Sequence, residues 1–260
     1  MPELPDVEMQ KRYLEATSLH QRIVGVAVRS PDILENVSSR KVGAELEGRS
    51  LETSRRHGKY LFAGLDSGVW LMLHFGMDGG LAYLAKEDQE PPYSRMLVRF
   101  EDGGRLAYVS VRKLGRVGIV RSVEQFIGEK ALGPDALDLD SSAFRNALGR
   151  TRAMVKAAFL DQHVVAGIGN ICADEILFQA RIHPRRPIGD LVGGELTRLF
   201  RATKHVLETA IELDADSRRF PESWFISHRY PGARCPRCGA ETARTRISNR
   251  TTYYCPACQR

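Results

Sequence analysis

Residues 161–184 read DQHVVAGIGNICADEILFQARIHP and contain two glycines between apolar runs. Gly167 and Gly169 separate two apolar runs of helical period, so the stretch predicts a helix, a glycine turn and a second helix beginning near Asn170. A glycine turn ahead of a helix exposes backbone N–H groups and the positive end of the helix dipole, which suit a phosphate. Helix, two turns and helix is also a known way to grip a DNA backbone. On its own, this pattern more often marks only a helix cap, with Asn170 as the capping residue.

On either side of this stretch the chain divides into a strand-rich and a helix-rich part. Apolar residues of helical period predict helices at 141–149, 152–160, 170–180 and 194–213. Ahead of them, Gly- and Asp-rich turns separate expected strands at 23–29, 60–65, 69–74, 80–84, 96–100, 105–109 and 116–121. Their regular spacing predicts an antiparallel sandwich, which follows an amino-terminal helix at 5–14. The pattern changes near residues 122–140, which we take as the connector between two domains.

Positive charge is concentrated at the carboxyl-terminal end of the chain. The net charge is +6, and the residues from Ser217 onward hold nine Arg and two Glu. Such a basic segment indicates a polyanionic partner, most simply nucleic acid, although a solvated surface without a ligand would have the same composition. No apolar run reaches the roughly 18 residues of a membrane span, and no basic and apolar export signal opens the chain. We therefore expect a globular protein of the cytoplasm.

Four of the five cysteines form two CxxC pairs near the end of the chain. The pairs are Cys235 with Cys238 and Cys255 with Cys258, and sixteen residues separate them. Each pair lets a tight turn point two sulfurs at one ion, and four thiolates close the coordination shell of a structural zinc. The intervening residues have the strand–turn–strand pattern of a zinc ribbon that displays arginines. The remaining cysteine, Cys172, is expected to be a small buried apolar residue.

Three features occur together along the chain: a Pro-Glu start in PELPDVE (2–8), the GIGN turn, and a four-cysteine ribbon that contains an arginine. With HFGMDG at 74–79, they resemble the formamidopyrimidine-DNA glycosylase / endonuclease VIII family of base-excision-repair enzymes over essentially the whole chain. The motifs are closer to the formamidopyrimidine-DNA glycosylase branch. The resemblance implies a bilobal α+β fold in which a two-layer antiparallel β-sandwich with an amino-terminal helix precedes a helix–two-turn–helix lobe and a zinc finger. DNA would bind in the cleft between the lobes.

The implied domains are a catalytic sandwich at 2–121, the connector at 122–140, a helix–two-turn–helix domain at 141–228 and a zinc finger at 229–260. The implied cofactor is one structural Zn²⁺.

The same resemblance assigns chemistry to the amino terminus. Removal of Met1 leaves Pro2 as a free secondary amine, and an α-amino group titrates near about pH 8, so a sizeable fraction is nucleophilic at neutral pH. Attack on the sugar C1′ displaces the damaged base, and the resulting iminium acidifies the C2′ proton, so β,δ-elimination cleaves the strand. Glu3 carries over as the acid that protonates and opens the sugar, which requires a partly desolvated site.

Other positions match the family residue by residue. Lys59, in RRHGKYLF, matches a lysine that assists elimination and contacts phosphate, although a surface lysine at a strand start is the simpler reading of that residue alone. Arg250, in NRTTYYC, matches the finger arginine that supports the second elimination and clamps phosphate. Asn170 matches an asparagine that binds the DNA backbone. Glu175 matches a carboxylate near the lesion, although a solvated helix glutamate would fit the same position.

An enzyme that flips a nucleotide out of the duplex must fill the space that is left. Met77 and Arg112 match two of the family's void-filling residues. The family's Asp-Pro-Arg-Arg-Phe-Gly stretch reads Ser-Val-Arg-Lys-Leu-Gly here (110–115), so Lys113 and Leu114 complete the expected DNA contacts. Leucine can still unstack a base step, but it cannot stack on a base as the family's phenylalanine does.

The segment that folds over the lesion in the 8-oxoguanine-specific enzymes is short in this chain, because 21 residues separate Leu213 from Cys235. A short segment favours a looser pocket that accepts formamidopyrimidines, oxidised pyrimidines, hydantoins or abasic sites.

The resemblance therefore implies a bifunctional DNA glycosylase and AP lyase that acts as a monomer on damaged double-stranded DNA, in a bacterial cytoplasm and on the nucleoid. Two alternatives stay open. A damaged-DNA-binding paralogue without chemistry is compatible with the altered 110–115 stretch. An unrelated zinc-ribbon binder of RNA explains the basic tail but not the amino terminus.

Overall fold

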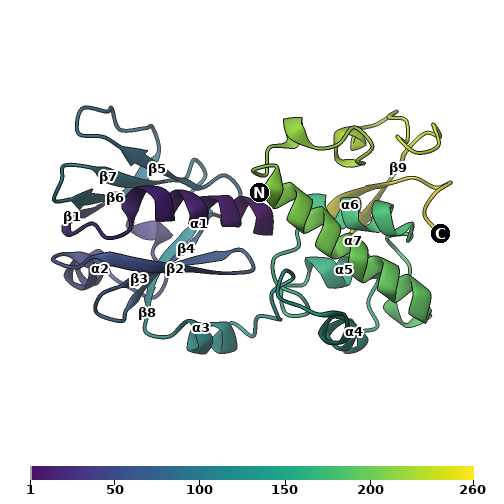
Figure 1. The fold of residues 1–260 in the computed structure, drawn as a ribbon, viewed down its shortest axis with the longest axis horizontal. Coiled ribbons are helices and arrows are strands. Elements are labelled where there is room, and N and C mark those ends of the chain that lie inside the picture. The colour runs from purple at the N-terminus through teal and green to yellow at the C-terminus, as the bar shows by residue number, and fades with distance from the viewer. Residues whose placement is uncertain (1) are drawn as a thin grey trace. The chain divides into compact units, whose positions relative to one another are not determined.

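The computed structural model describes residues 2–260, and these divide into two compact units (Figure 1). Unit 1 consists of Pro2 and Asp6–Lys130, and unit 2 consists of Glu3–Pro5 and Ala131–Arg260. The division falls at residue 130, within the connector expected at 122–140. The finer division into four segments stays a prediction. No helix in residues 2–260 combines the length and apolar character needed to cross a membrane.

Unit 1 is an antiparallel β-sandwich, as the strand spacing predicts. One sheet has the order β1-β6-β7-β5 and the other the order β2-β3-β4-β8. The strands are β1 (Ile23–Val28), β2 (Leu51–His57), β3 (Tyr60–Leu65), β4 (Trp70–His74), β5 (Gly80–Leu84), β6 (Ser94–Phe100), β7 (Arg105–Val109) and β8 (Arg116–Val120). Two short helices, α2 (Ser39–Leu46) and α3 (Val123–Glu129), complete the unit.

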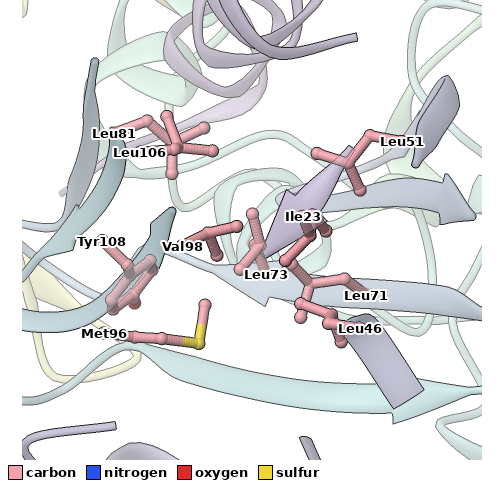
Figure 2. A pocket seen from close by; sticks show the side chains of 10 residues that line it. All are labelled: Ile23, Leu46, Leu51, Leu71, Leu73, Leu81, Met96, Val98, Leu106 and Tyr108. Atoms are coloured by element: carbon pink, nitrogen blue, oxygen red, sulfur yellow. The ribbon is translucent and has the colours of Figure 1, made fainter. Parts of the chain in front are cut away.

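The core of unit 1 lies between the two sheets. Figure 2 shows the side chains, mostly aliphatic, that line a small void and come from both sheets and from α2. The void has a volume of about 10 Å³. The residues around the void are Ile23, Leu46, Leu51, Leu71, Leu73, Leu81, Met96, Val98, Leu106 and Tyr108. An apolar void of this size is a packing defect rather than a ligand site, because a bound water would need polar partners.

Helix α1 (Leu4–Ser18) closes the sandwich along one side. Val7 and Leu14 are fully buried in the core between the sheets. Polar side chains of α1 satisfy the edge strand of one sheet, because Gln10 Oε1 accepts the Leu81 N–H (2.7 Å) and the Tyr13 hydroxyl accepts the Tyr83 N–H (2.8 Å). Without these bonds, the two backbone N–H groups at the edge of the sheet would have no acceptor in the sheet.

Unit 2 is helical apart from one hairpin. Its elements are α4 (Ser141–Gly149), α5 (Val155–Leu160), α6 (Asn170–Ala180), α7 (Gly193–Glu212), β9 (Ala243–Ile247) and β10 (Arg250–Tyr254). The fully buried Leu199, Val206 and Leu207 on α7 continue the helical period expected for 194–213. The hairpin turns at Ser248 and Asn249, whose φ values of +48° and +58° are those of a type I′ turn. The α+β fold class is therefore confirmed.

Three elements were not anticipated. Strand β2 reads LETSRRH, which is too polar to predict a strand, and it forms at a sheet edge where most of its side chains are not buried. Helices α2 and α3 are too short to show a helical period. Both begin at a serine, Ser38 or Ser122, whose side chain accepts a backbone N–H three residues on.

Candidate functional site

The amino-terminal residues are seated on the start of α6. Glu3 is only 3% exposed, and its carboxylate accepts the backbone N–H groups of Gly169 (3.1 Å), Ile171 (2.8 Å) and Cys172 (2.9 Å). The Leu4 N–H donates to the Gly167 carbonyl (3.1 Å). A negative charge at this position is favoured by the helix dipole. Glu3 is therefore desolvated, as expected, but its three N–H partners favour the ionised carboxylate, and its role as the acid stays a prediction.

This contact corrects two sequence-based interpretations. The amides of Gly169, Ile171 and Cys172 bind the chain's own carboxylate, so the prediction that the turn offers these groups to a phosphate is wrong. The prediction that Asn170 caps α6 is also wrong. The cap residue is Gly169, and its cap has no side-chain bond, because the acceptor for the first turn comes from Glu3.

Close approach explains both glycines of the turn. A Cβ on Gly169 would lie 2.3 Å from the Glu3 carboxyl carbon, and a Cβ on Gly167 would lie 2.4 Å from a Leu4 methyl group. Gly167 also has φ of +109°, which favours glycine. The two glycines are thus required by the amino-terminal segment that packs on them.

Asn170 and Arg250 lie at the same end of unit 2. The Asn170 amide donates to the backbone carbonyl of Thr251 (3.1 Å), the residue that follows Arg250 in β10. The Asn170 Oδ1 atom is buried and has no hydrogen-bond partner in the described chain. Arg250 is exposed and adjoins the hairpin turn. The structure therefore brings together two residues that the sequence places 80 positions apart.

A buried ion network, which the sequence did not indicate, holds the hairpin against α5 and α6. Lys156 and Asp174 are both fully buried, and the Lys156 ammonium donates to Asp174 and to the Thr252 hydroxyl (2.7 Å). Asp174 also accepts Arg229 Nε (2.9 Å) and the Tyr253 N–H (3.3 Å). Burial raises the pKa of Asp174 and lowers that of Lys156, and their mutual attraction offsets part of this cost. Two of these partners come from β10, so the network fixes the strand that carries Arg250.

Glu175 is fully buried, so the alternative of a solvated helix glutamate is wrong. Its carboxylate accepts the Gln179 amide (2.6 Å) and the Ile226 N–H (2.9 Å), which ties α6 to the segment between α7 and the zinc finger. Burial raises the pKa of Glu175 from 4.5 to about 7. The carboxyl group therefore changes its charge close to neutral pH.

We expect the titration of Glu175 to make the free energy of unfolding depend on pH. Between pH 4.5 and about 7 the folded chain holds the Glu175 proton more tightly than the unfolded chain, so the free energy of unfolding falls as pH rises through that window. The fall amounts to up to about 3 kcal/mol. Urea denaturation at pH 5 and pH 8 would measure it, with Glu175→Gln as the variant from which the fall is absent. Identical pH profiles for the two proteins would contradict the assignment.

In unit 1, the void-filling candidates lie on two loops that pack together. Met77 and Leu114 are apolar side chains that are 36% and 46% exposed. A Cβ on Gly76 would lie 2.4 Å from the Leu114 carbonyl carbon, so the loops touch through their backbones. Lys113 lies on the second loop in a left-handed conformation (φ +54°), and its ammonium pairs with Asp32 at 3.2 Å. Arg112 pairs with Asp78 of the first loop.

Lys59 is half-buried in the turn that connects β2 and β3. It lies close enough to His74 to affect that ring, because burial first and the Lys59 charge second lower the pKa of His74 to about 4. His74 is therefore neutral at physiological pH. It belongs to the HFGMDG motif, which could have drawn attention to it. Pro2, also in unit 1, is half-buried.

The four cysteine sulfurs of the carboxyl-terminal hairpin all lie within 4.8 Å of one another. The Cys235–Cys258 and Cys238–Cys255 sulfur pairs are 3.9 Å and 3.5 Å apart. Tetrahedral zinc with bonds of about 2.3 Å places its sulfurs roughly 3.8 Å apart, so the arrangement fits the ion. The four-thiolate shell is closed, which assigns zinc a structural role. Cys172 lies apart and is buried, as expected.

Chelation of zinc should unfold the finger and leave the sandwich folded, because the finger has only a small apolar cluster around Phe178, Phe225 and two of the cysteines. The chain has two tryptophans, Trp70 in β4 and the buried Trp224 next to Phe225. With EDTA, we expect a red shift of Trp224 emission in a Trp70→Phe variant and unchanged Trp70 emission in a Trp224→Phe variant. Parallel loss of both signals would contradict a finger-specific role.

Comparisons with known proteins agree with this architecture. Residues 1–117 match the formamidopyrimidine-DNA glycosylase N-terminal domain, 131–222 match the formamidopyrimidine-DNA glycosylase H2TH domain, and 232–260 match a zinc finger found in FPG and IleRS. Formamidopyrimidine-DNA glycosylases of Heliobacterium modesticaldum and Desulfitobacterium hafniense are 34% and 35% identical, with complete coverage of both chains in each case. The zinc-finger match and the four-cysteine cluster together establish a site for one structural zinc ion.

Solved structures give the same result. Lactococcus lactis Fpg in complex with DNA containing N7-benzyl-Fapy-dG has a TM-score of 0.89 at 29% identity, over 99% of each chain. MutM in complex with DNA containing carbocyclic 8-oxo-G also has a TM-score of 0.89, at 30% identity and the same coverage. Because relatives more than 30% identical match over the full length, the chain belongs to the formamidopyrimidine-DNA glycosylase family.

Proposed function

We propose that this protein is a base-excision-repair DNA glycosylase that removes oxidised bases and then cleaves the strand as an AP lyase. The observation that carries the proposal is the seating of Glu3 on the backbone N–H groups of Gly169, Ile171 and Cys172 at the start of α6. Neutral side chains or water also satisfy the first amides of a helix, so capping alone does not explain why a buried carboxylate directly follows Pro2. The full-length family match supports the same conclusion.

The reaction begins when the secondary amine of Pro2, exposed by removal of Met1, attacks C1′ of the damaged nucleotide. The new N–C1′ bond replaces the glycosidic bond, whose electron pair leaves with the base, and the amine proton passes to the departing base. Glu3 then protonates the ring oxygen O4′ as the C1′–O4′ bond breaks, and the nitrogen electron pair forms the iminium between Pro2 and C1′. Loss of the C2′ proton then expels the 3′ phosphate, and a second elimination expels the 5′ phosphate. Lys59 assists the first elimination and Arg250 the second.

Six further side chains are proposed to contact DNA: Met77, Arg112, Lys113, Leu114, Asn170 and Glu175. Arg250 is exposed and precedes Thr251, whose carbonyl accepts the Asn170 amide, which supports a phosphate-binding role for this end of unit 2. Met77 and Leu114 are exposed apolar side chains on adjoining loops, which supports insertion into the base stack. Glu175 lies beneath the segment at Ile226, so its influence on a lesion would pass through that segment.

We propose that the segment between α7 and the zinc finger sets the lesion range. After α7 the chain reaches the zinc finger through 214–231, which includes short 3-10 turns at Ser217–Arg219 and Ile226–His228. A short segment favours a pocket that accepts formamidopyrimidines, oxidised pyrimidines, hydantoins or abasic sites. We propose that the protein acts as a monomer on damaged duplex DNA, in the bacterial cytoplasm and in association with the nucleoid.

Borohydride trapping tests this function. Duplexes carrying an abasic site, 8-oxoguanine, a formamidopyrimidine or an oxidised pyrimidine would be incubated with protein whose intact mass shows that it begins at Pro2. A covalent adduct is expected, and the panel ranks the lesions. No adduct on any duplex would favour a damaged-DNA-binding paralogue without chemistry, the alternative compatible with the altered 110–115 loop.

A further inference from the structure

Asp78 connects the two loops that hold the void-filling candidates of unit 1. The carboxylate accepts Arg112 Nε at one oxygen, and the Arg112 N–H (3.4 Å) and the Ser110 hydroxyl (3.3 Å) at the other. The side chain of Asp78 is 19% exposed and that of Arg112 is 52% exposed, so the pair lies at the surface with the carboxylate on the inner side. The Arg112 guanidinium holds the pKa of Asp78 below its usual value, so the carboxylate is ionised at neutral pH.

A second residue holds the same loop from its backbone. Arg95 donates from Nε to the Ser110 carbonyl (2.7 Å) and from Nη2 to the Val111 carbonyl (3.0 Å). Its guanidinium also lies 5.5 Å from the centre of the Tyr93 ring. The backbone next to Arg112 is therefore held at two carbonyls, and Asp78 is left to orient the Arg112 side chain.

The bond to Asp78 determines which N–H donors of Arg112 remain for another ligand. A guanidinium has five N–H donors in a rigid planar fork and no acceptor. Asp78 takes the Nε donor, and the terminal nitrogens of Arg112 have no hydrogen-bond partner within residues 2–260. A long arginine side chain otherwise samples many rotamers, whereas this one presents its terminal N–H groups in a limited set of directions.

We propose that Asp78 is a specificity-determining residue, which fixes the Arg112 fork so that it discriminates among the bases that can stand opposite the lesion. The inference rests on the proposed function, in which Arg112 enters the space left by the flipped nucleotide. A fixed pair of donors favours a base that presents adjacent acceptors and disfavours one that presents donors. Leu114 cannot stack on that base as an aromatic side chain would, so hydrogen bonding by Arg112 carries a larger share of the discrimination.

The charge of Asp78 makes this role distinguishable from a purely structural one. A carboxylate close to a DNA backbone repels phosphates, so its removal should maintain or increase affinity for duplex DNA in general. Removal should at the same time lower the discrimination among opposite bases. A variant that merely misfolds the loop would instead weaken binding to every duplex.

The test measures binding of duplexes that carry an uncleavable tetrahydrofuran abasic analogue opposite C, T, G or A, by fluorescence anisotropy at fixed salt. We expect Asp78→Asn to reduce the ratio of the tightest to the weakest Kd by about fivefold, the size expected for loss of one well-formed charge pair. Affinity for an undamaged duplex should stay equal or rise. Asp78→Glu should restore part of the ratio, and Glu87→Gln, at an exposed carboxylate of the same unit, should leave it unchanged.

A double-mutant cycle with Arg112→Ala checks that the effect passes through Arg112. In the Arg112→Ala background, Asp78→Asn should cause no further loss of discrimination. The proposal is overturned if Asp78→Asn keeps the wild-type ratio, if it weakens all duplexes in proportion, or if it lowers the ratio further without Arg112. A wild-type protein that forms the borohydride adduct but shows no opposite-base preference would also overturn it. That result would leave the glycosylase function standing, because binding is measured without catalysis.

Discussion

An amino-terminal extension that leaves Pro2 within a peptide bond is expected to abolish borohydride trapping on every duplex, by at least about a thousandfold. The physical reason is that an acylated nitrogen shares its electron pair with the carbonyl and cannot attack a sugar carbon. Proteolytic removal of the same extension, leaving Pro2 first, should restore full trapping. Pro2→Gly, in processed protein, should retain part of the activity through a primary amine.

Two controls separate chemistry from folding in this experiment. The extended and processed proteins should have the same thermal stability, because Pro2 is only half-buried and Glu3 supplies the contact with α6. They should also bind an undamaged duplex with similar affinity. Equal trapping by protein shown by mass to retain its extension would remove Pro2 from the role of nucleophile.

Asp174→Ala is expected to reduce the free energy of unfolding of unit 2 by about 3–5 kcal/mol, the largest stability effect of a single substitution that we expect for this chain. Removal of the carboxylate leaves the Lys156 ammonium fully buried with only the Thr252 hydroxyl as a partner. It also takes from Arg229 its carboxylate partner. Lys156→Met should cost much less, because Asp174 keeps Arg229 and the Tyr253 N–H.

The comparison is measured by urea denaturation in a Trp70→Phe background, where the buried Trp224 reports on unit 2. A Glu208→Ala variant serves as the control, because its contact with Lys204 on α7 is exposed and long (3.9 Å). If Lys156→Met were as destabilising as Asp174→Ala, the uncompensated-charge explanation would be wrong. The loss would then reflect the packing of the lysine stem.

Much of the fold follows from local patterns. The seven expected strands form close to their expected bounds, because alternation and turn residues act over a few positions. Strand β2 was missed for the opposite reason: its polar sequence forms a strand only because β3 supplies the hydrogen bonds. Residues 141–149 and 170–180 were expected as helices and form α4 and α6 with those bounds.

Some residues of the candidate site could also be predicted from local patterns, and others could not. CxxC spacing is a local property, so the four zinc ligands could be identified from the sequence, and the structure places their sulfurs within 4.8 Å of one another. The partners of buried charges are not local properties. Neither Lys156 with Asp174 nor Glu175 with Ile226 could be paired from spacing, since each contact depends on how separate elements pack.

The family, the sandwich followed by a helical part, the glycine turn and the zinc ligands can all be predicted from the sequence, because each rests on a short motif or period. What the amides at the glycine turn bind depends on tertiary packing. Three amides at the start of α6 donate to the Glu3 carboxylate, which lies 166 residues or more away in the chain, rather than to an outside anion. Proximity of this kind arises from packing, and no local pattern encodes it. For the same reason, the pairing of Asp78 with Arg112 cannot be predicted from the sequence, because it depends on the contact between two loops.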